Sequence, residues 1–229
     1  MNPAINGDLL LRVAVDTDAM DWSTSPSGTV FRKRVHLVGP PEAGQVTSLV
    51  RYEPNAAFPS HDHPDGEEIL VLDGVFSDEH GDWPKGTYLL NPEGFRHRPF
   101  SKNGCLLLVK LRQYAGRERR HIAVQTDTLN WASTQNAGVS VKLLYQQAEF
   151  EDVVRLERWD AGTQRDRVHY ESGAELFVLE GAFSDAFGRY GKGCWLRFPI
   201  DSEHAPRSRD GCIVYVKTGG MSALWSAEK

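Results

Sequence analysis

The sequence has few cysteines, no long apolar run and no excess of positive charge, and each absence excludes a class of protein. Its three cysteines, Cys105, Cys194 and Cys212, are too widely spaced for a disulfide framework or a CxxC zinc pattern, so we expect them to be reduced and mostly buried. No apolar stretch approaches the roughly 18 residues that a membrane helix needs. The N-terminal segment lacks a secretion signal, so we expect a cytoplasmic protein with no membrane partner.

Acidic residues outnumber basic ones, which argues against nucleic acid as a partner. There are 31 Asp and Glu residues against 26 Lys and Arg, giving a formal charge of −5. The one basic cluster, Arg117, Arg119 and Arg120 followed by His121, indicates a solvated linker rather than an anion site. The sequence also lacks a Ser-His-Asp or Cys-His arrangement and a glycine-rich phosphate loop, so we expect neither a hydrolase nor a nucleotide-dependent enzyme.

The chain contains an internal duplication. GEEILVLDGVFSDEHG, starting at Gly66, aligns without a gap on GAELFVLEGAFSDAFG, starting at Gly173, so each residue of the first copy meets the residue 107 positions later. Further upstream, TDAMDW at Thr17 aligns with TDTLNW at Thr126 once a two-residue gap is allowed. These matches divide the chain into two repeats of about 105 residues each.

Each repeat predicts β-structure. Its apolar segments are short, rich in Val, Leu, Phe and Tyr, and separated by Gly, Pro and Asp at intervals of roughly 8 to 12 residues. Examples are VTSLVRY and CLLLVKL in the first repeat and VVRLERW and CIVYVKT in the second. We therefore expect an all-β protein in which helix is minor.

A metal site is indicated in the first repeat. Residues i and i+2 of a strand project from one face, so His61 and His63 of SHDHP can direct two imidazoles to the same point. After a Pro-Asp-Gly turn, Glu67 supplies a carboxylate, and His97 at the end of a later strand is a fourth candidate. Imidazole and carboxylate together suit a divalent first-row metal.

The second repeat decides between Glu67 and its neighbour Glu68 as the ligand. In that copy the counterparts of the three positions are not metal ligands; His61, His63 and Glu67 are replaced by Val168, Tyr170 and Ala174. Glu68, in contrast, is matched by Glu175. A residue that persists where the ligands are lost is more often structural, so we assign Glu67 as the ligand.

The second repeat retains one histidine of the set. His204 matches His97 but stands alone, and a single buried histidine is usually a hydrogen-bonded core residue. His169 lies in the opposite strand register, so we expect it to face outward. The sequence therefore predicts one divalent metal per chain, held by the first repeat.

At these residues the sequence resembles the cupin superfamily. The first cupin motif is HxH, three or four residues, Glu, six residues and Gly, and His61, His63, Glu67 and Gly74 satisfy it. A glycine usually precedes this motif by six residues, where the sequence has Asn55, a residue that also tolerates left-handed backbone.

The second cupin motif is also complete. It runs Gly, five residues, Pro, any residue, Gly, two residues and His, as in Gly86, Pro92, Gly94 and His97; Ser101 replaces an asparagine that often follows. The resemblance implies two tandem double-stranded β-helix (jelly-roll) barrels, with three His and one Glu holding zinc or iron, or alternatively manganese or nickel. The expected parts are an N-terminal extension (1–16), a metal-binding cupin repeat (17–115), a linker (116–125), a degenerate cupin repeat (126–220) and a C-terminal tail (221–229).

Among cupins, the tandem arrangement most resembles the ChrR-like proteins, in which such domains form the sensory half of anti-sigma factors. Those proteins also carry an N-terminal helical zinc module with His and Cys ligands, for which residues 1–16 offer no counterpart, so a sigma factor is not expected as a partner. The barrels are expected to pair, either in a homodimer or within one chain.

Three functions stay open at this stage. The first is a non-haem metal enzyme acting on a small molecule, such as a dioxygenase that cleaves a carbon–carbon bond of a diketone or hydroxyketone. The second is a metal-bound sensory domain that binds a small ligand, and the third is an assembly module with a structural metal. Strand parity suggests that Ile69 and Val71 line the site, whereas four aromatic residues are candidate neighbours of it: Tyr52, Phe58, Tyr88 and Phe95.

Overall fold

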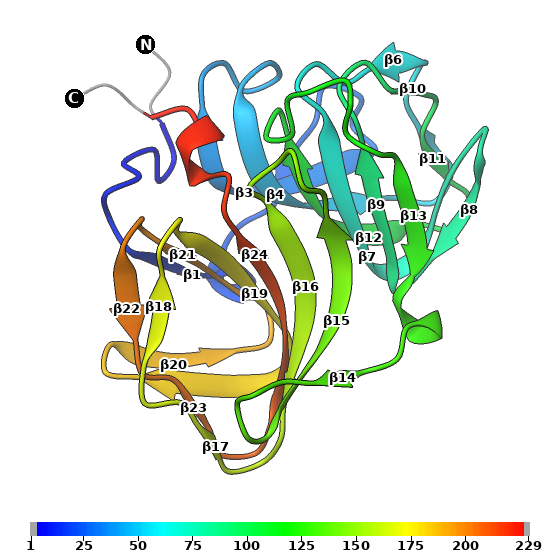
Figure 1. Cartoon of the computed structure of the whole chain (residues 1–229). Coiled ribbons are helices and arrows are strands. Elements are labelled where there is room, and N and C mark those ends of the chain that lie inside the picture. The colour runs from blue at the N-terminus through cyan, green and yellow to red at the C-terminus, as the bar shows by residue number, and fades with distance from the viewer. Residues whose placement is uncertain (1–3, 227–229) are drawn as a thin grey trace. The chain divides into compact units, whose positions relative to one another are not determined.

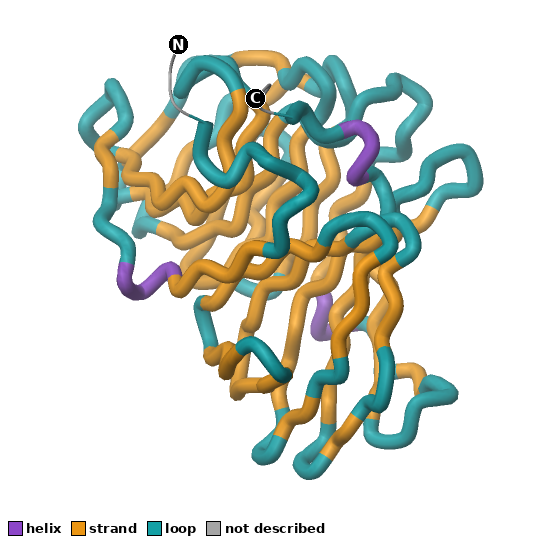
Figure 2. The backbone as a smooth tube through the Cα atoms, turned by 90° about the vertical axis from the view of Figure 1, so that its left-hand side faces the viewer, coloured by secondary structure: helices purple, strands orange, loops and turns teal. Residues whose placement is uncertain are grey.

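A computed structural model describes residues 4–226, and these residues are folded almost entirely as β-strands. Helical structure among them is limited to single 3-10 turns at Thr17–Ala19, Thr126–Thr128 and Met221–Ala223 (Figure 2). None of the described helices is long and apolar enough to cross a membrane. The prediction of an all-β protein is confirmed.

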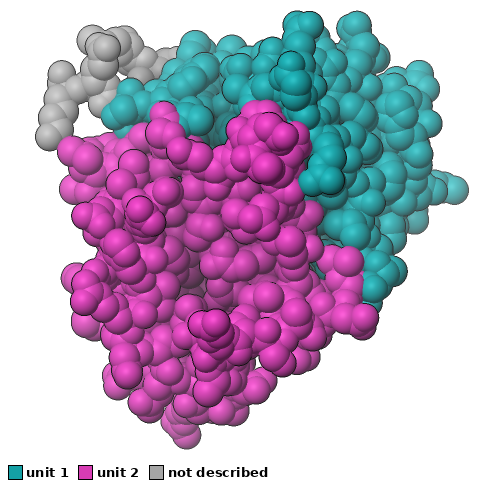
Figure 3. Space-filling view, in the orientation of Figure 1, with its two compact units in different colours: residues 1–7, 20–128, 223–229 teal, residues 8–19, 129–222 magenta. Residues whose placement is uncertain are grey.

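The chain forms two compact units, which are coloured separately in Figure 3. The first unit comprises residues 1–7, 20–128 and 223–229, and the second comprises residues 8–19 and 129–222. Each unit contains most of one sequence repeat, so the duplication seen in the sequence corresponds to a duplication of structure.

The first unit is a barrel built on one large antiparallel sheet with the strand order β13-β9-β7-β12-β4-β3-β2 (Figure 1). The strands of this sheet are β2 (Ser23–Thr24), β3 (Val30–Val38), β4 (Gln45–Tyr52), β7 (Glu67–Asp78), β9 (Thr87–Asn91), β12 (Cys105–Leu111) and β13 (Ile122–Gln125). Shorter strands complete the barrel: β5 (Ala56–Ala57), β6 (His61–Asp62), β8 (Gly81–Pro84), β10 (Arg96–His97) and β11 (Phe100–Ser101).

The second unit repeats this order strand for strand, as β1-β21-β19-β24-β16-β15-β14. Its main-sheet strands are β1 (Val13–Asp16), β14 (Ala132–Ser133), β15 (Val139–Gln146), β16 (Val153–Trp159), β19 (Ala174–Asp185), β21 (Cys194–Phe198) and β24 (Cys212–Thr218). The remaining strands are β17 (Thr163–Gln164), β18 (Val168–Tyr170), β20 (Gly188–Gly191), β22 (Ser202–His204) and β23 (Arg207–Ser208).

The two units exchange their first strands. β1 precedes the first repeat in the sequence, yet it pairs with β21 in the second unit, from Val13 opposite Arg197 to Asp16 opposite Cys194. β13 precedes the second repeat and pairs with β9 in the first unit. Part of the expected N-terminal extension (1–16) therefore forms an edge strand of the second unit, and part of the expected linker (116–125) forms one of the first.

Gly74 lies where β7 changes its pairing partners within the barrel. The strand pairs with β9 and β12 in its first half and with β8 in its second half, and the change occurs beside Gly74, whose φ is +72°. A Cβ atom at this position would lie 2.3 Å from the carbonyl oxygen of Gly104, so only glycine fits. This close approach is the physical reason for the last glycine of the HxH motif.

The interior of the first unit follows the alternation of its strands. Along β7, Glu67 and Ile69 face the barrel interior with Val71, while Glu68 and Leu70 face the other side. The inward-facing apolar residues form one buried cluster: Val30, Val50, Tyr52, Ala56, Ile69, Val71, Phe76, Leu89, Cys105, Leu107 and Val109. The candidate metal residues lie beside this buried apolar cluster.

Candidate metal centre

Strand pairing and one turn bring the histidines together. β6 and β10 are antiparallel, with His61 directly opposite His97. The backbone of His63, just after β6, is fixed from both sides: its N–H donates to the Phe95 carbonyl at 3.1 Å, and its carbonyl accepts from the Gly94 N–H at 3.0 Å. Gly94 of the second cupin motif therefore helps to hold the turn that leads into His97.

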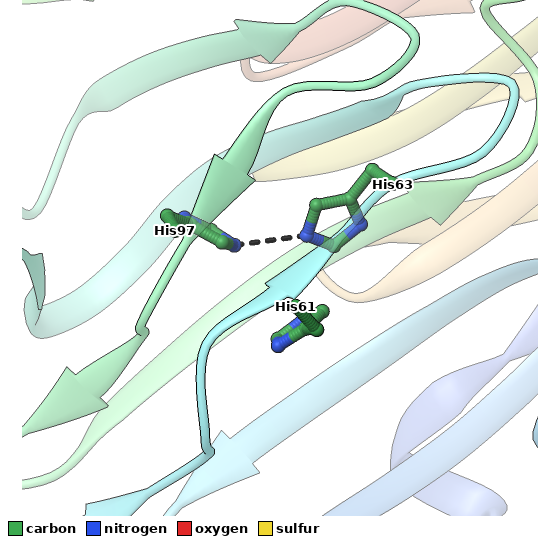
Figure 4. A group of neighbouring side chains, drawn as sticks. All are labelled: His61, His63 and His97. Atoms are coloured by element: carbon green, nitrogen blue, oxygen red, sulfur yellow. Dashed lines mark hydrogen bonds between the residues drawn. The ribbon is translucent and has the colours of Figure 1, made fainter.

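The three imidazoles lie close together, and Figure 4 shows the His63 and His97 rings facing each other with His61 nearby. One nitrogen from each of His61, His63 and His97 lies within 4.8 Å of the other two, and the Nε2 atoms of His63 and His97 are 2.9 Å apart. His63 and His97 are buried, whereas His61 is partly exposed. This arrangement agrees with the sequence prediction that the three histidines lie close together.

Glu67 lies beside two of these histidines. Its Oε2 is 3.4 Å from His63 Nε2 and 3.5 Å from His97 Nε2. The Asn91 side-chain amide donates to this oxygen at 2.9 Å and so orients the carboxylate. Glu68 points to the opposite face of β7, where the Tyr114 hydroxyl donates to it.

Hydrogen bonds on the outer nitrogens fix the tautomers of two histidines. His97 Nδ1 lies 3.1 Å from Asp78 Oδ2, and His61 Nδ1 lies 2.9 Å from the Pro59 carbonyl oxygen. Both partners are acceptors, so each Nδ1 carries the proton and each Nε2 presents a lone pair. Histidines that bind metal are usually held in this way by a carboxylate or a carbonyl.

The separations among His63, His97 and Glu67 fit a single metal ion. Two ligand atoms that each lie about 2.1 Å from one metal are about 3.0 to 3.4 Å apart, for angles between a right angle and the tetrahedral value. The three contacts among His63, His97 and Glu67, at 2.9, 3.4 and 3.5 Å, lie close to this range. To bind one ion, both histidines must present an unprotonated Nε2, so a cation would take the place of the proton shared by the two Nε2 atoms, and His63 would carry its own proton on Nδ1.

The surroundings shift the pKa values of these groups in different directions. Burial lowers the pKa of His63, although the Glu67 carboxylate opposes this. Burial also lowers the pKa of His97, but the hydrogen bond to Asp78 and the charge of Glu67 outweigh it and raise the pKa overall. Burial alone would raise the pKa of Asp78, but hydrogen bonds from His97, His80 and Trp83 have the larger effect and lower this pKa overall. Asp78 is therefore ionised at neutral pH.

A cavity of about 290 Å³ opens onto this cluster within the first unit. It is bordered by His61, His63 and Glu67 and by apolar side chains that include Ile69 and Leu107. Of the other candidate neighbours, Tyr52 and Phe58 also line the cavity, and Val71 packs in the core beside it. Phe95 lies 5.8 Å from the His97 ring, whereas Tyr88 pairs with Leu70 on the other face of the sheet.

Sequence reasoning missed Asp78 and Asn91, the residues that orient His97 and Glu67. A signal for Asp78 was present, because the triplet Phe-Ser-Asp occurs in both repeats and ends at Asp78 and Asp185. Asn91 had no such signal, since the second repeat places Phe198 at the matching position. The amide is retained only where there is a carboxylate ligand for it to orient.

The second unit keeps the histidine–aspartate pair without the other ligands. His204 Nδ1 lies 3.1 Å from Asp185 Oδ2, and its Nε2 lies 3.2 Å from the Tyr170 hydroxyl. Tyr170, which replaces His63, therefore takes the nitrogen that would bind a metal. His169 is exposed and contacts Asp201 at 2.7 Å.

Charged side chains lie in the interior of the second unit, one of them at the position of a cavity-lining residue of the first. Glu157 contacts Arg155 at 2.7 Å and Arg165 at 3.2 Å, and it accepts a hydrogen bond from Trp159 Nε1 at 2.9 Å. By strand register, Glu157 replaces the cavity-lining Val50 of the first unit. The loss of the ligands and this charged interior occur in the same unit.

The comparisons with known proteins agree with this architecture. The sequence matches the ChrR Cupin-like domain family twice in tandem, over residues 11–115 and 119–222. The chain belongs to this family. The resemblance of both motifs to cupins, and the prediction of two tandem cupin barrels, are thereby confirmed. No curated protein matches this cupin.

Several solved structures share the fold of this cupin at low sequence identity. A candidate dioxygenase from Nostoc punctiforme is 18% identical, with 96% of this chain and 88% of that chain covered and a TM-score of 0.74. A candidate glyoxylate-induced protein from Pseudomonas aeruginosa is 12% identical, with coverages of 90% and 88% and a TM-score of 0.72. A deletion mutant of Bacillus subtilis oxalate decarboxylase is 10% identical, with coverages of 90% and 76% and a TM-score of 0.62.

Proposed function

We propose that this cupin is a metal-dependent enzyme that acts on a small organic molecule in the cavity of the first unit. One observation supports this most strongly: His61, His63 and Glu67, which would hold a divalent metal together with His97, border a cavity large enough for a small ligand. A metal with no other function than to stabilise the barrel does not require an open cavity beside it.

We expect the metal to be zinc or iron, with manganese and nickel as alternatives, because imidazole and carboxylate ligands suit all four metals. When bound, such an ion acts as a Lewis acid and orients a substrate oxygen. The chain's own residues prepare the site: Asp78 keeps the Nε2 lone pair of His97 available, and Asn91 holds the Glu67 carboxylate. Phe58 and Ile69 supply apolar walls that limit the access of water.

Within this proposal, the reaction is that of a dioxygenase that cleaves a carbon–carbon bond of a small diketone or hydroxyketone. The shared fold with the Nostoc punctiforme candidate dioxygenase supports this direction. The alternative is a metal-bound sensory domain that binds a similar ligand without turning it over. Both use the same residues and the same cavity, so only an activity measurement separates them.

The test combines metal analysis with oxygen uptake. We expect about one metal per chain and substrate-dependent oxygen consumption with a β-diketone or a hydroxyacetophenone, which His97→Ala abolishes and His204→Ala does not. Metal binding with no oxygen consumption for either class would favour the sensory alternative. Absence of metal from protein purified without chelators would contradict both.

A further inference from the structure

The cavity of the first unit also contains two arginines. Arg32 and Arg34 lie two residues apart on β3, opposite Val50 and Ser48 of β4, so both project from the face that lines the cavity. Their side chains are mostly buried, with 19% and 15% exposed. Guanidinium groups in such a position carry a fixed positive charge with donors suited to a carboxylate.

A single carboxylate engages both arginines. Glu42, in the segment between β3 and β4, accepts hydrogen bonds from Arg32 Nη1 at 2.7 and 2.8 Å and from Arg34 Nη2 at 3.1 Å. The Glu42 side chain is 51% exposed, so its carboxylate can move into solvent at little cost. Two positive charges face one negative charge, and Arg34 Nε is buried with no hydrogen-bond partner among the described residues.

The second unit has no arginine at the positions that match Arg32 and Arg34. By strand register, Val141 opposite Glu157 replaces Arg32, and Leu143 opposite Arg155 replaces Arg34. The second unit has interior arginines of its own, Arg155 and Arg165, but both contact Glu157, whose side chain is only 5% exposed. Glu42 is half exposed instead, so Arg32 and Arg34 can exchange this carboxylate for one that a ligand brings into the cavity.

We propose that Arg32 and Arg34 bind the carboxylate of a small organic acid, and that Glu42 occupies this anion subsite in the ligand-free protein. The ligand's carbonyl end would face the histidine cluster, and its body would contact apolar cavity residues such as Val50 and Leu107. This inference rests on the proposed function and narrows its substrate class from a neutral ketone to a keto acid with an apolar body.

Calorimetric titration with 4-oxo-4-phenylbutanoate and its neutral methyl ester tests the subsite. We expect the acid to bind the purified protein more tightly than the ester. Replacing Arg34 by Gln should weaken acid binding by about tenfold, because a charge-assisted hydrogen bond is lost, and leave ester binding unchanged. Glu42→Gln removes the competing carboxylate and should strengthen acid binding, a gain that a misfolded variant cannot produce.

Arg51 and Glu53 provide matched controls. They form a partly exposed pair at 3.1 Å, and neither lines the cavity, so Arg51→Gln and Glu53→Gln should leave acid binding unchanged. Equal binding of acid and ester, or unchanged acid affinity in both Arg34→Gln and Glu42→Gln, would overturn the subsite. The metal content of each sample is measured as well. Absence of metal from every sample would contradict the proposed function, whereas the affinity for the acid would still test whether the arginines bind a carboxylate.

Discussion

Replacing Asp78 by Asn should invert the tautomer of His97 and weaken metal binding. The Oδ1 atom of Asp78 accepts from the backbone N–H groups of His80 at 2.8 Å and Gly81 at 3.2 Å, and from Trp83 Nε1 at 3.2 Å. These donors require an acceptor, so the amide nitrogen of the asparagine would take the other position, facing His97 Nδ1. His97 would then carry its proton on Nε2, the atom that must bind the metal.

The magnitude follows from the hydrogen bonds that must be broken. To bind metal, His97 in the variant must either face its Nδ1–H towards an amide donor or force the amide to turn towards the N–H groups that contact Oδ1. A buried polar group left without a partner costs about 1 to 3 kcal/mol. We therefore expect a loss of about 10- to 100-fold in metal affinity, equivalent to about 1.4 to 2.7 kcal/mol.

Asp185→Asn is the matched control, because Asp185 contacts His204 Nδ1 at the same distance, 3.1 Å, in a unit whose other ligands are lost. The assay is a competition titration against a chromophoric chelator at neutral pH. Asp78→Asn should lower metal affinity, whereas Asp185→Asn should leave it unchanged and lower only the melting temperature. An affinity of Asp78→Asn within about twofold of the unmodified protein would refute the tautomer argument.

Three further predictions concern the same residues and their surroundings. Elemental analysis should find about one metal per chain, with strong loss in His61→Ala, His63→Ala and His97→Ala but not in His204→Ala; two equivalents would contradict this. Because each histidine ligand must be neutral and His97 has a raised pKa, metal content and melting temperature should fall together as pH drops from about 6.5 towards 5, and constant metal content down to pH 4 would oppose this. Glu157→Gln should lower the free energy of unfolding by about 3 kcal/mol, since it removes the negative charge that Arg155 and Arg165 share in the interior, whereas Glu53→Gln in a partly exposed pair should cost less than about 1 kcal/mol; equal losses in chemical denaturation would count against the buried network.

The ligand cluster could be predicted from the sequence because its spacing is local. His61 and His63 need only strand alternation, Glu67 follows one turn later, and His97 ends the strand that pairs back on His61. The barrel class was equally accessible, since strand length and turn residues repeat along the chain.

The strand exchange, in contrast, could not be predicted from the sequence. β1 and β13 have similar apolar patterns and both fit the edge next to a central strand, so nothing in either segment specifies whether it pairs with β9 or β21. Arg32, Arg34 and Glu42 were missed for a related reason. Charged residues on a predicted strand usually face solvent, and only the register of β3 against β4 places these arginines towards the cavity.

The second unit separates residues kept for the fold from residues kept for the site. Gly181 matches Gly74 because a Cβ there would lie 2.1 Å from the Gly211 carbonyl oxygen, a constraint of the barrel that holds with or without a ligand. Asp185 and His204 persist because Tyr170 and Arg12 complete their hydrogen bonds. His61, His63, Glu67 and Asn91, in contrast, are all replaced in that unit, as are Arg32 and Arg34. Their common loss, against a barrel that is otherwise preserved, supports a single function for all of them in the first unit.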